Sequence, residues 1–245
     1  MGRNFFELAN DCLDLMFYSP APTFDDLDTT EGRMVKKRLN FVLREICGGE
    51  HDIWKFRERY KNFRLVANKR EYPMVHGYIL SIKPDDRSDR IPLLYNNDYL
   101  YLPSTATGTP VQYWIYGNKI NLFPIPTKQQ EGTNYRIQYL TDCFAVDEDG
   151  CEKKQMEDAT DEPIIPDTFR DILVYGVMKD WRGNAGDNQA IFYKRKYNEM
   201  YQNMLYTMQL SEDYLKGFRL NDVPMSNLEA MTNAFYNPYV QGDKR

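Results

Sequence analysis

Few residues in this sequence have the types and the spacing that catalysis or cofactor binding requires. Its two histidines, His51 and His76, lie at no metal-ligand spacing from each other or from a cysteine. The stretch 183–186 is too short for a phosphate-binding loop and lacks the lysine of such loops. Adjacent carboxylates such as Asp85 and Asp86 could act as general acid and base, but loop carboxylates are usually only solvated. The sequence therefore predicts no catalytic residue and no cofactor, and an enzyme is the least expected class.

The acidic run 147–149, followed by Gly150, raises the question of a calcium-binding loop. In such a loop the glycine takes the sixth position, and carboxylates take the first and the twelfth. Those two positions here hold Ala145 and Met156, whose side chains cannot coordinate calcium. We therefore expect no metal site.

Four cysteines are scattered through the chain without a C-x-x-C pair. Cys12 and Cys47 fall on apolar positions of predicted helices, so we expect both to be small buried hydrophobic residues. Cys143 and Cys151 are close enough in sequence for a disulfide, but no secretory signal supports one. We expect reduced thiols in a protein assembled in the cytoplasm. Polar residues interrupt the early apolar stretch, so we expect no membrane span there.

The amino-acid composition further restricts the classes of function that we expect. The chain has 245 residues, of which 42% are hydrophobic, and this is enough for a packed interior. Its 19 tyrosines and 13 phenylalanines suit β-faces and wet protein–protein interfaces. A net charge of -5 argues against a dedicated nucleic-acid-binding protein. The short basic runs 36–38 and 194–196 are typical of solvated helix faces, so we expect at most weak, non-specific and salt-dependent contact with DNA.

Hydrophobic periodicity predicts helices near both ends of the sequence. Apolar residues recur at three- and four-residue steps over 4–17, and again after a cap at Asp28, Thr29 or Thr30. The second stripe contains Val35, Leu39, Val42, Leu43 and Ile46. Helix returns after Pro166, and a longer helix spans about 188–210, with an apolar face of Ile191, Tyr193, Tyr197, Met200, Met204 and Leu205.

The middle of the chain changes to the alternating pattern of β-strands. The clearest signal is a hairpin over 112–123, in which two turn residues, Gly117 and Asn118, join two alternating strands. Five or six such strands predict a small antiparallel sandwich or barrel. The fold class is therefore α+β: a discontinuous helical bundle, an inserted β-domain and an extended C-terminal arm.

We expect the bundle to comprise 1–61 and 163–216, with the β-domain at 62–141. Residues 142–162 are acidic and poor in aliphatic side chains, which favours a mobile linker or surface loop. Periodicity fades in 217–245, so this segment is predicted to be an arm. It either binds a neighbouring subunit or another partner, or packs back on its own bundle. Its candidate partner contacts are Phe218, Met225, Leu228, Phe235 and Tyr236.

The ordered set of elements resembles the head-to-tail adaptor proteins of short-tailed bacteriophages, the group that includes tail tubular protein A. The resemblance covers roughly residues 30–210. Five segments carry it: the strand 77–82, the hairpin and prolines of 117–126, the strand 135–139, the helix that follows Ile165-Pro166, and the tyrosine-spaced helix through Tyr193, Tyr197 and Tyr201.

This resemblance implies a structural virion protein rather than an enzyme. It implies a homo-oligomeric ring, of twelve copies, below the portal protein at the portal vertex. Such a ring would extend the DNA channel and offer a docking platform for the next tail or nozzle protein. The linker 142–162 and the arm 217–245 depart from the pattern of the family.

A second hypothesis treats the β-domain as a tail-associated module that recognises a glycan or receptor. Its candidate surface aromatics are Tyr99, Tyr101, Tyr113 and Tyr116, accompanied by Tyr95 and Trp114. Aromatic faces stack on sugar rings, although most of these side chains would instead fill a sheet core or line a subunit contact.

Overall fold

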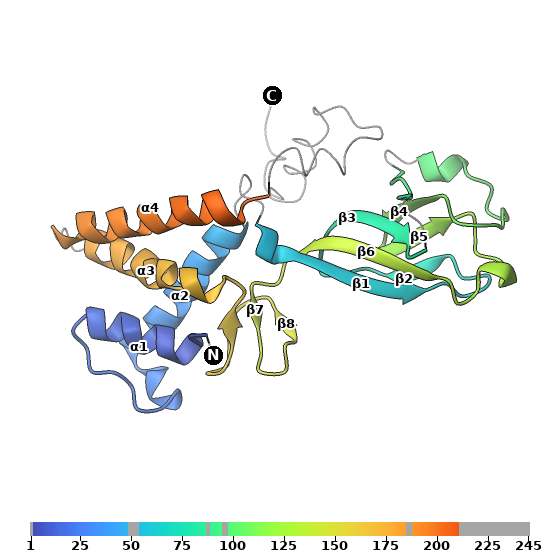
Figure 1. The fold of residues 1–245 in the computed structure, drawn as a ribbon. Helices are drawn as coiled ribbons and strands as arrows, with labels where there is room; N and C mark the ends of the chain where they lie inside the picture. Colours follow the sequence, from blue (N-terminus) through green and yellow to red (C-terminus); the bar gives the residue numbers. More distant parts are fainter. Residues whose placement is uncertain (1, 49–53, 87–88, 95–97, 185–187, 211–245) are drawn as a thin grey trace, which may run out of the picture. The chain divides into compact units, whose positions relative to one another are not determined.

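The computed structural model describes residues 2–48, 54–86, 89–94, 98–184 and 188–210 (Figure 1). They fall into two compact units. The first, which we call the helical unit, contains the described residues of 1–63, 73–79 and 136–209. The second, the β-unit, contains those of 64–72 and 80–135, together with Leu210. The fold is α+β, as the sequence predicts.

Four α-helices build the helical unit: α1 (Phe5–Leu15), α2 (Thr30–Gly48), α3 (Asp171–Asn184) and α4 (Gln189–Met208). Three short 3-10 helices accompany them: η1 (Asp25–Asp28), η2 (Lys55–Arg57) and η5 (Asp167–Phe169). Of the three residues expected to cap the second helix, Thr29 does so, because its hydroxyl accepts a hydrogen bond from the Gly32 N–H at 3.1 Å.

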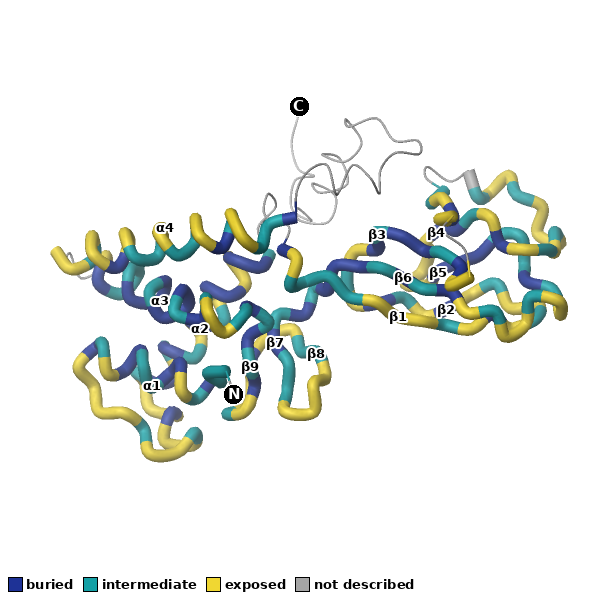
Figure 2. The backbone as a smooth tube through the Cα atoms, in the orientation of Figure 1, coloured by how far each residue is buried: buried dark blue, intermediate teal, exposed yellow. Residues whose placement is uncertain are grey.

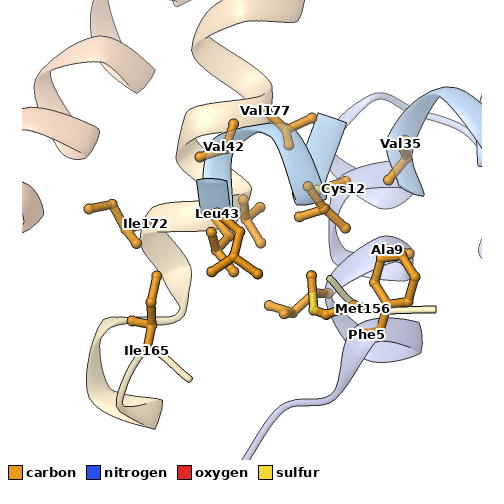
Figure 3. Close-up of a cluster of buried hydrophobic side chains, with 14 of the residues drawn as sticks. Phe5, Ala9, Cys12, Val35, Val42, Leu43, Met156, Ile165, Ile172 and Val177 are labelled. Carbon is orange, nitrogen blue, oxygen red and sulfur yellow. The ribbon is translucent and has the colours of Figure 1, made fainter. Parts of the chain in front are cut away.

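The core of the helical unit lies where α1, α2 and α3 meet the segment 145–165 (Figure 3). The predicted stripe of α2 is confirmed, since Val35, Leu39, Val42, Leu43 and Ile46 are all buried. Cys12 and Cys47 are also buried, as expected. Burial raises the pKa of both thiols, that of Cys47 to about 12, so neither is a reactive thiolate at neutral pH.

Helix α4 lies beside α3 and turns one side to solvent (Figure 2). Tyr193 and Met204 are buried, and the rings of Tyr197 and Tyr201 stack with centroids 6.0 Å apart. Ile191 was predicted to face inward, but it is 74% exposed. It lies in the first turn of α4, and the buried face of this helix begins only at Tyr193.

The strands form three sheets of three strands each. The first has the order β1-β6-β3, from β1 (Glu58–Arg64), β6 (Asn134–Thr141) and β3 (Gly77–Pro84). The second has the order β2-β5-β4, from β2 (Glu71–Pro73), β5 (Lys119–Phe123) and β4 (Gln112–Tyr116). The third has the order β8-β7-β9, from β8 (Glu152–Lys153), β7 (Ala145–Val146) and β9 (Glu162–Pro163). No closed barrel forms within the described part of the chain.

The predicted hairpin is confirmed in the β-unit, where β4 pairs with β5 in antiparallel register. Gly117 and Asn118 form its turn with φ of 57° and 59°, the left-handed values of a type I′ turn. Two further 3-10 helices, η3 (Asp98–Tyr101) and η4 (Lys128–Gln130), lie in the same unit.

The prediction of a mobile linker at 142–162 is wrong. These residues form β7, β8 and the first residue of β9, and they carry Ala145 and Met156 into the core of the helical unit. The acidic composition misled the prediction because some acidic residues here are structural: Asp161 is fully buried and Glu152 pairs with Arg59 at 2.8 Å. The segment needs few aliphatic residues of its own to be ordered, since it packs against helices supplied by both ends of the sequence.

Candidate protein-binding surfaces

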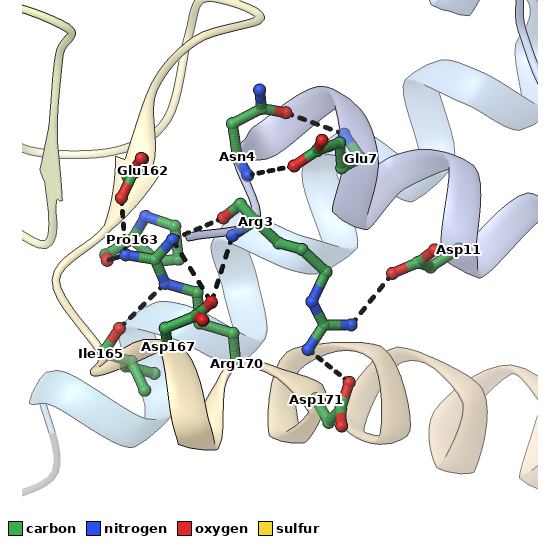
Figure 4. A network of polar contacts seen from close by, with 10 residues as sticks. All are labelled: Arg3, Asn4, Glu7, Asp11, Glu162, Pro163, Ile165, Asp167, Arg170 and Asp171. Atoms are coloured by element: carbon green, nitrogen blue, oxygen red, sulfur yellow. Dashed lines mark hydrogen bonds and ion pairs between the residues drawn. The ribbon is translucent and has the colours of Figure 1, made fainter. Parts of the chain in front are cut away.

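Arg170, in the turn before α3, organises the start of α1 (Figure 4). Its buried guanidinium donates hydrogen bonds to the carbonyls of Ile165 at 3.1 Å and Arg3 at 2.7 Å. It also donates to the carboxylate of Glu162 at 2.8 Å. A planar guanidinium presents several donors in a fixed fork, which suits this multiple recognition. The network therefore ties residues 162–170 to the N-terminal segment.

Arg3 extends this network on the other side of the N-terminal segment. Its guanidinium pairs with Asp11 at 3.1 Å and with Asp171 at 2.5 Å, and its backbone N–H donates to Asp167 Oδ1 at 3.1 Å (Figure 4). The carboxylates raise the pKa of Arg3 although burial opposes them. Helices α1 and α3 are thus joined by ion pairs as well as by their apolar faces.

The first N–H groups of α1 are satisfied from outside the helix. Phe5 N–H donates to the carbonyl of Asp161 at 2.8 Å, and Phe6 N–H to that of Ala159 at 3.2 Å. Asn4 and Glu7 add a reciprocal capping box, with both hydrogen bonds at 3.0 Å. Since unsatisfied N–H groups at a helix start are costly when buried, residues 159–161 fix where α1 begins.

Asp161 holds the turn that supplies these carbonyls. Its carboxylate accepts hydrogen bonds from the N–H groups of Glu157 at 2.6 Å and Asp158 at 2.8 Å, and from Lys153 Nζ at 2.8 Å. Burial by itself would raise the pKa of Asp161. The hydrogen bonds to its ionised form outweigh that effect and hold the pKa below its ordinary value.

A groove of about 520 Å³ runs along α2, and we call it the basic groove. Phe5 and Met156 contribute buried apolar surface, and Phe41 is 44% exposed. Asn40 fixes one wall, because its amide side chain bonds both the N–H and the carbonyl of Met156 at 2.9 Å. The remaining lining residues are Lys36, Lys37, Arg44, Gln155 and Glu157.

The cations of the basic groove differ in how they are compensated. Lys36 pairs with Asp28 at 2.8 Å and lies 4.8 Å from the centroid of the Phe24 ring. Lys37 and Arg44 have no ion-pair partner within the described part of the chain. The groove therefore combines exposed aromatic surface with uncompensated positive charge on a protein whose net charge is -5.

The opposite end of α1 carries exposed aromatic side chains. The helix ends in a Schellman motif, in which Tyr18 N–H donates to the Leu13 carbonyl and Phe17 N–H to that of Asp14, both at 2.9 Å. Phe17 occupies the position that usually holds glycine, with φ of 65°, and it is 81% exposed. The Arg182 guanidinium lies 5.2 Å from the centroid of its ring. We call Phe17 and Tyr18 the aromatic knob.

The four candidate aromatic side chains of the β-unit differ in their exposure to solvent. Tyr101 and Tyr116 are exposed, whereas Tyr113 is only 3% exposed and belongs to the core. Tyr99 stacks on the buried Trp114 with ring centroids 5.4 Å apart and planes 4° apart. The Arg70 guanidinium lies 5.7 Å from the Trp114 ring centroid, so Tyr99 and Trp114 serve packing more than an open sugar-binding face.

Several predicted features fall outside the described residues. These include Tyr95, His51 and all the candidate contacts of the C-terminal arm: Phe218, Met225, Leu228, Phe235 and Tyr236. Both surfaces on α1 and α2 escaped the sequence reasoning. A usable signal existed for α2, since Lys37, Phe41 and Arg44 recur at helical spacing beside its apolar stripe. No comparable signal marked Phe17.

Metal-binding clusters and membrane-spanning helices are both absent from the described ranges. No group of three or more histidine, cysteine, aspartate or glutamate side chains there could hold a metal ion. Among the same residues, no helix has the length and apolar character needed to cross a bilayer.

The basic runs lie on helix surfaces, as expected. Lys37, Arg38, Lys194 and Arg195 are exposed, and Glu199 pairs with both Arg195 and Lys196.

Comparison with known proteins identifies the family to which the chain belongs. A comparison with curated proteins finds no match. The family model described as SU10 adaptor protein matches residues 4–219, which is most of the sequence. This family is a structural one, which points away from catalysis and toward a component of the phage particle. With its α+β fold and with helices at both ends of the matched region, the chain belongs to the SU10 adaptor protein family and is a bacteriophage adaptor protein.

Proposed function

We propose that this protein is the head-to-tail adaptor subunit that forms a ring, of twelve copies, directly below the portal. The ring extends the DNA channel and provides the docking platform for the next tail or nozzle protein. The observation that carries this proposal is the family match over residues 4–219. A ring of identical subunits needs two different complementary surfaces on each copy, and the basic groove and the aromatic knob are two such surfaces.

The C-terminal segment 217–245 is proposed to contact the portal or a neighbouring subunit through Phe218, Met225, Leu228, Phe235 and Tyr236. An arm that orders on contact adds buried area at an entropic cost. Deleting 217–245 tests this part separately: a shortened protein that joins the ring and the portal normally would exclude it.

Contact with the DNA in the channel is proposed to be weak, independent of sequence and strongly salt-dependent. The ion pairs of Lys36, Arg195 and Lys196 already compensate part of the positive charge on α2 and α4. Fewer phosphate contacts mean a lower affinity, and because the remaining contacts are purely electrostatic, salt should abolish them readily. Tight binding that survives high salt would contradict this view.

A phage that lacks the gene for this protein tests the adaptor role. We expect such phages to accumulate heads without tails, because the platform for the next tail component is missing. Adding the purified protein to these heads, together with tail components, should restore tail attachment. If tails attach equally well without the protein, the proposed function is wrong.

A further inference from the structure

We propose that each subunit inserts its aromatic knob, Phe17 and Tyr18, into the basic groove of α2 on the next subunit. This inference rests on the proposed ring and names the two surfaces that meet at each of its subunit contacts. The occupant of the groove is therefore a defined segment of a second copy of this chain.

The conformation of Phe17 is the first argument. A non-glycine residue with φ near 65° is strained, and a bulky one is a clear outlier. A buried ring could offset that strain by its hydrophobic contacts, but Phe17 is 81% exposed. The isolated subunit thus holds this ring in water at a cost. Burial against a partner would recover the missing contacts.

The second argument is that the groove has the surface such a knob requires. Its volume of about 520 Å³ accommodates aromatic side chains, and Phe41 provides exposed apolar surface there, whereas Phe5 and Met156 line it as buried residues. Phe41 is itself 44% exposed in the middle of α2. Aromatic pairs contribute beyond the area they bury, so a Phe17–Phe41 contact would stabilise the interface.

Charge complementarity is the third argument. Asp14, in the last turn of α1 beside the knob, is exposed. It has no ion-pair partner among the residues that the structure describes, and the same holds for Lys37 and Arg44 in the groove. A free negative charge therefore lies next to the knob, and free positive charges line the groove. Complementary charges steer association and fix register.

The placement of the two surfaces fits a ring. Phe5, at the start of α1, lines the groove, and the knob follows the last turn of the same helix. The eleven residues of α1 separate them by about 16 Å at 1.5 Å per residue. A contact between different surfaces of identical copies is heterologous, and such contacts close into rings when the rotation permits.

A disulfide experiment tests the contact directly in the full chain. Phe17→Cys and Phe41→Cys are combined in one protein that also carries Cys151→Ser, because Cys151 is the exposed native cysteine and the other three are buried. After assembly on the portal and mild oxidation, we expect a ladder of covalent oligomers in denaturing gels. Each single-cysteine variant, as the matched control, should give no ladder. Absence of a ladder from rings that do form would overturn the inference.

A mixing experiment tests the direction of the contact. Phe17→Gly removes the more exposed ring of the knob, and Lys37→Glu with Arg44→Glu reverses the charge of the groove. We expect each variant to fold but to assemble at least about 10-fold more weakly than wild type, because central aromatic contacts dominate interfaces. Mixed together, the two variants should stop at a dimer, since only one intact knob and one intact groove can meet.

Charge restoration completes the test. Adding Asp14→Lys to the groove-reversed chain should recover assembly, because the signs are complementary again. Rings formed by Phe17→Gly and by Lys37→Glu/Arg44→Glu as readily as by wild type would overturn this interface and leave the proposed function intact. A wild-type protein that forms no ring, even with the portal, would overturn both.

Discussion

The guanidinium of Arg170 donates a hydrogen bond of 2.7 Å to the backbone carbonyl of Arg3, 167 positions away in the sequence. Through this contact the turn before α3 holds the residues that precede α1. The helical unit is therefore closed by polar contacts between its two sequence-distant parts, in addition to the apolar core that α1, α2 and α3 share.

Replacing Arg170 should unfold the protein more easily. Arg170→Ala leaves the carbonyls of Ile165 and Arg3 and the carboxylate of Glu162 without their buried donor, so we expect a loss of about 3–5 kcal/mol in the free energy of unfolding. Urea denaturation followed by circular dichroism measures it. Arg44→Ala, the same change at an exposed arginine, should stay within about 0.5 kcal/mol of wild type. Equal effects of the two changes would contradict the role of the network.

Asp161 should make stability depend on acid pH. Because its folded-state pKa is lowered, it stabilises the fold above its ordinary pKa, and this contribution disappears as pH falls through the folded value. We expect Asp161→Asn to cost about 1–3 kcal/mol at pH 7, and to cost progressively less below about pH 4. Urea titrations of wild type and Asp161→Asn at pH 7 and below about pH 4 measure these costs. Asp149→Asn, in the exposed turn between β7 and β8, should have little effect at either pH. A cost for Asp161→Asn that does not change with pH would refute the proposed ionic role.

Phe17 should not increase the free energy of unfolding of the isolated subunit relative to glycine at the same position. Phe17→Ala and Phe17→Gly remove the same ring, but only glycine removes the strain of the left-handed backbone. We therefore expect Phe17→Gly to be about 1 kcal/mol more stable than Phe17→Ala and no less stable than wild type. Thermal unfolding of the three proteins measures the difference. If both variants are strongly destabilised alike, the ring of Phe17 has a structural role within the subunit that its exposure does not suggest.

Two glycines in α3 should respond in opposite ways to the same substitution. A Cβ on Gly176 would lie 2.5 Å from Val42 Cγ1 and 3.3 Å from the Tyr197 ring, so Gly176→Ala should cost about 1–3 kcal/mol through overpacking. A Cβ on Gly183 would meet nothing within 4 Å, so Gly183→Ala should stabilise the helix by up to about 1 kcal/mol.

A double-mutant cycle adds a check on this packing argument. In Val42→Ala/Gly176→Ala the new methyl group has room, so the double variant should lose less stability than the sum of the two single changes. Stabilisation by Gly176→Ala alone would show that α2 and α3 can separate at no cost. Urea unfolding of all four proteins supplies the comparison.

The helices could be predicted because their apolar residues recur on one face. Val35, Leu39 and Val42 follow the helical period, and all three are buried. The hairpin over 112–123 was equally readable, since Gly117 and Asn118 adopt the left-handed values that such a turn demands. Both signals are local, and neither depends on which distant segment provides the partner surface.

The features that escaped prediction depend on distant contacts. Asp161 has the composition of a solvated loop, yet its carboxylate is buried and bonded to Lys153. Phe17 looks like one more apolar residue of α1, and its exposure follows only from the left-handed backbone that ends the helix. The basic groove combines α1, α2 and residues 155–157, so no single segment of sequence reveals it.

Electron microscopy of the purified protein mixed with the portal protein of the same phage tests the central claim most directly. We predict a collar of additional density stacked coaxially on the portal ring, with twelve copies of the chain in contact around the axis. Bare portals beside free monomers, at concentrations where both proteins are folded, would contradict the proposed place of this adaptor in the virion.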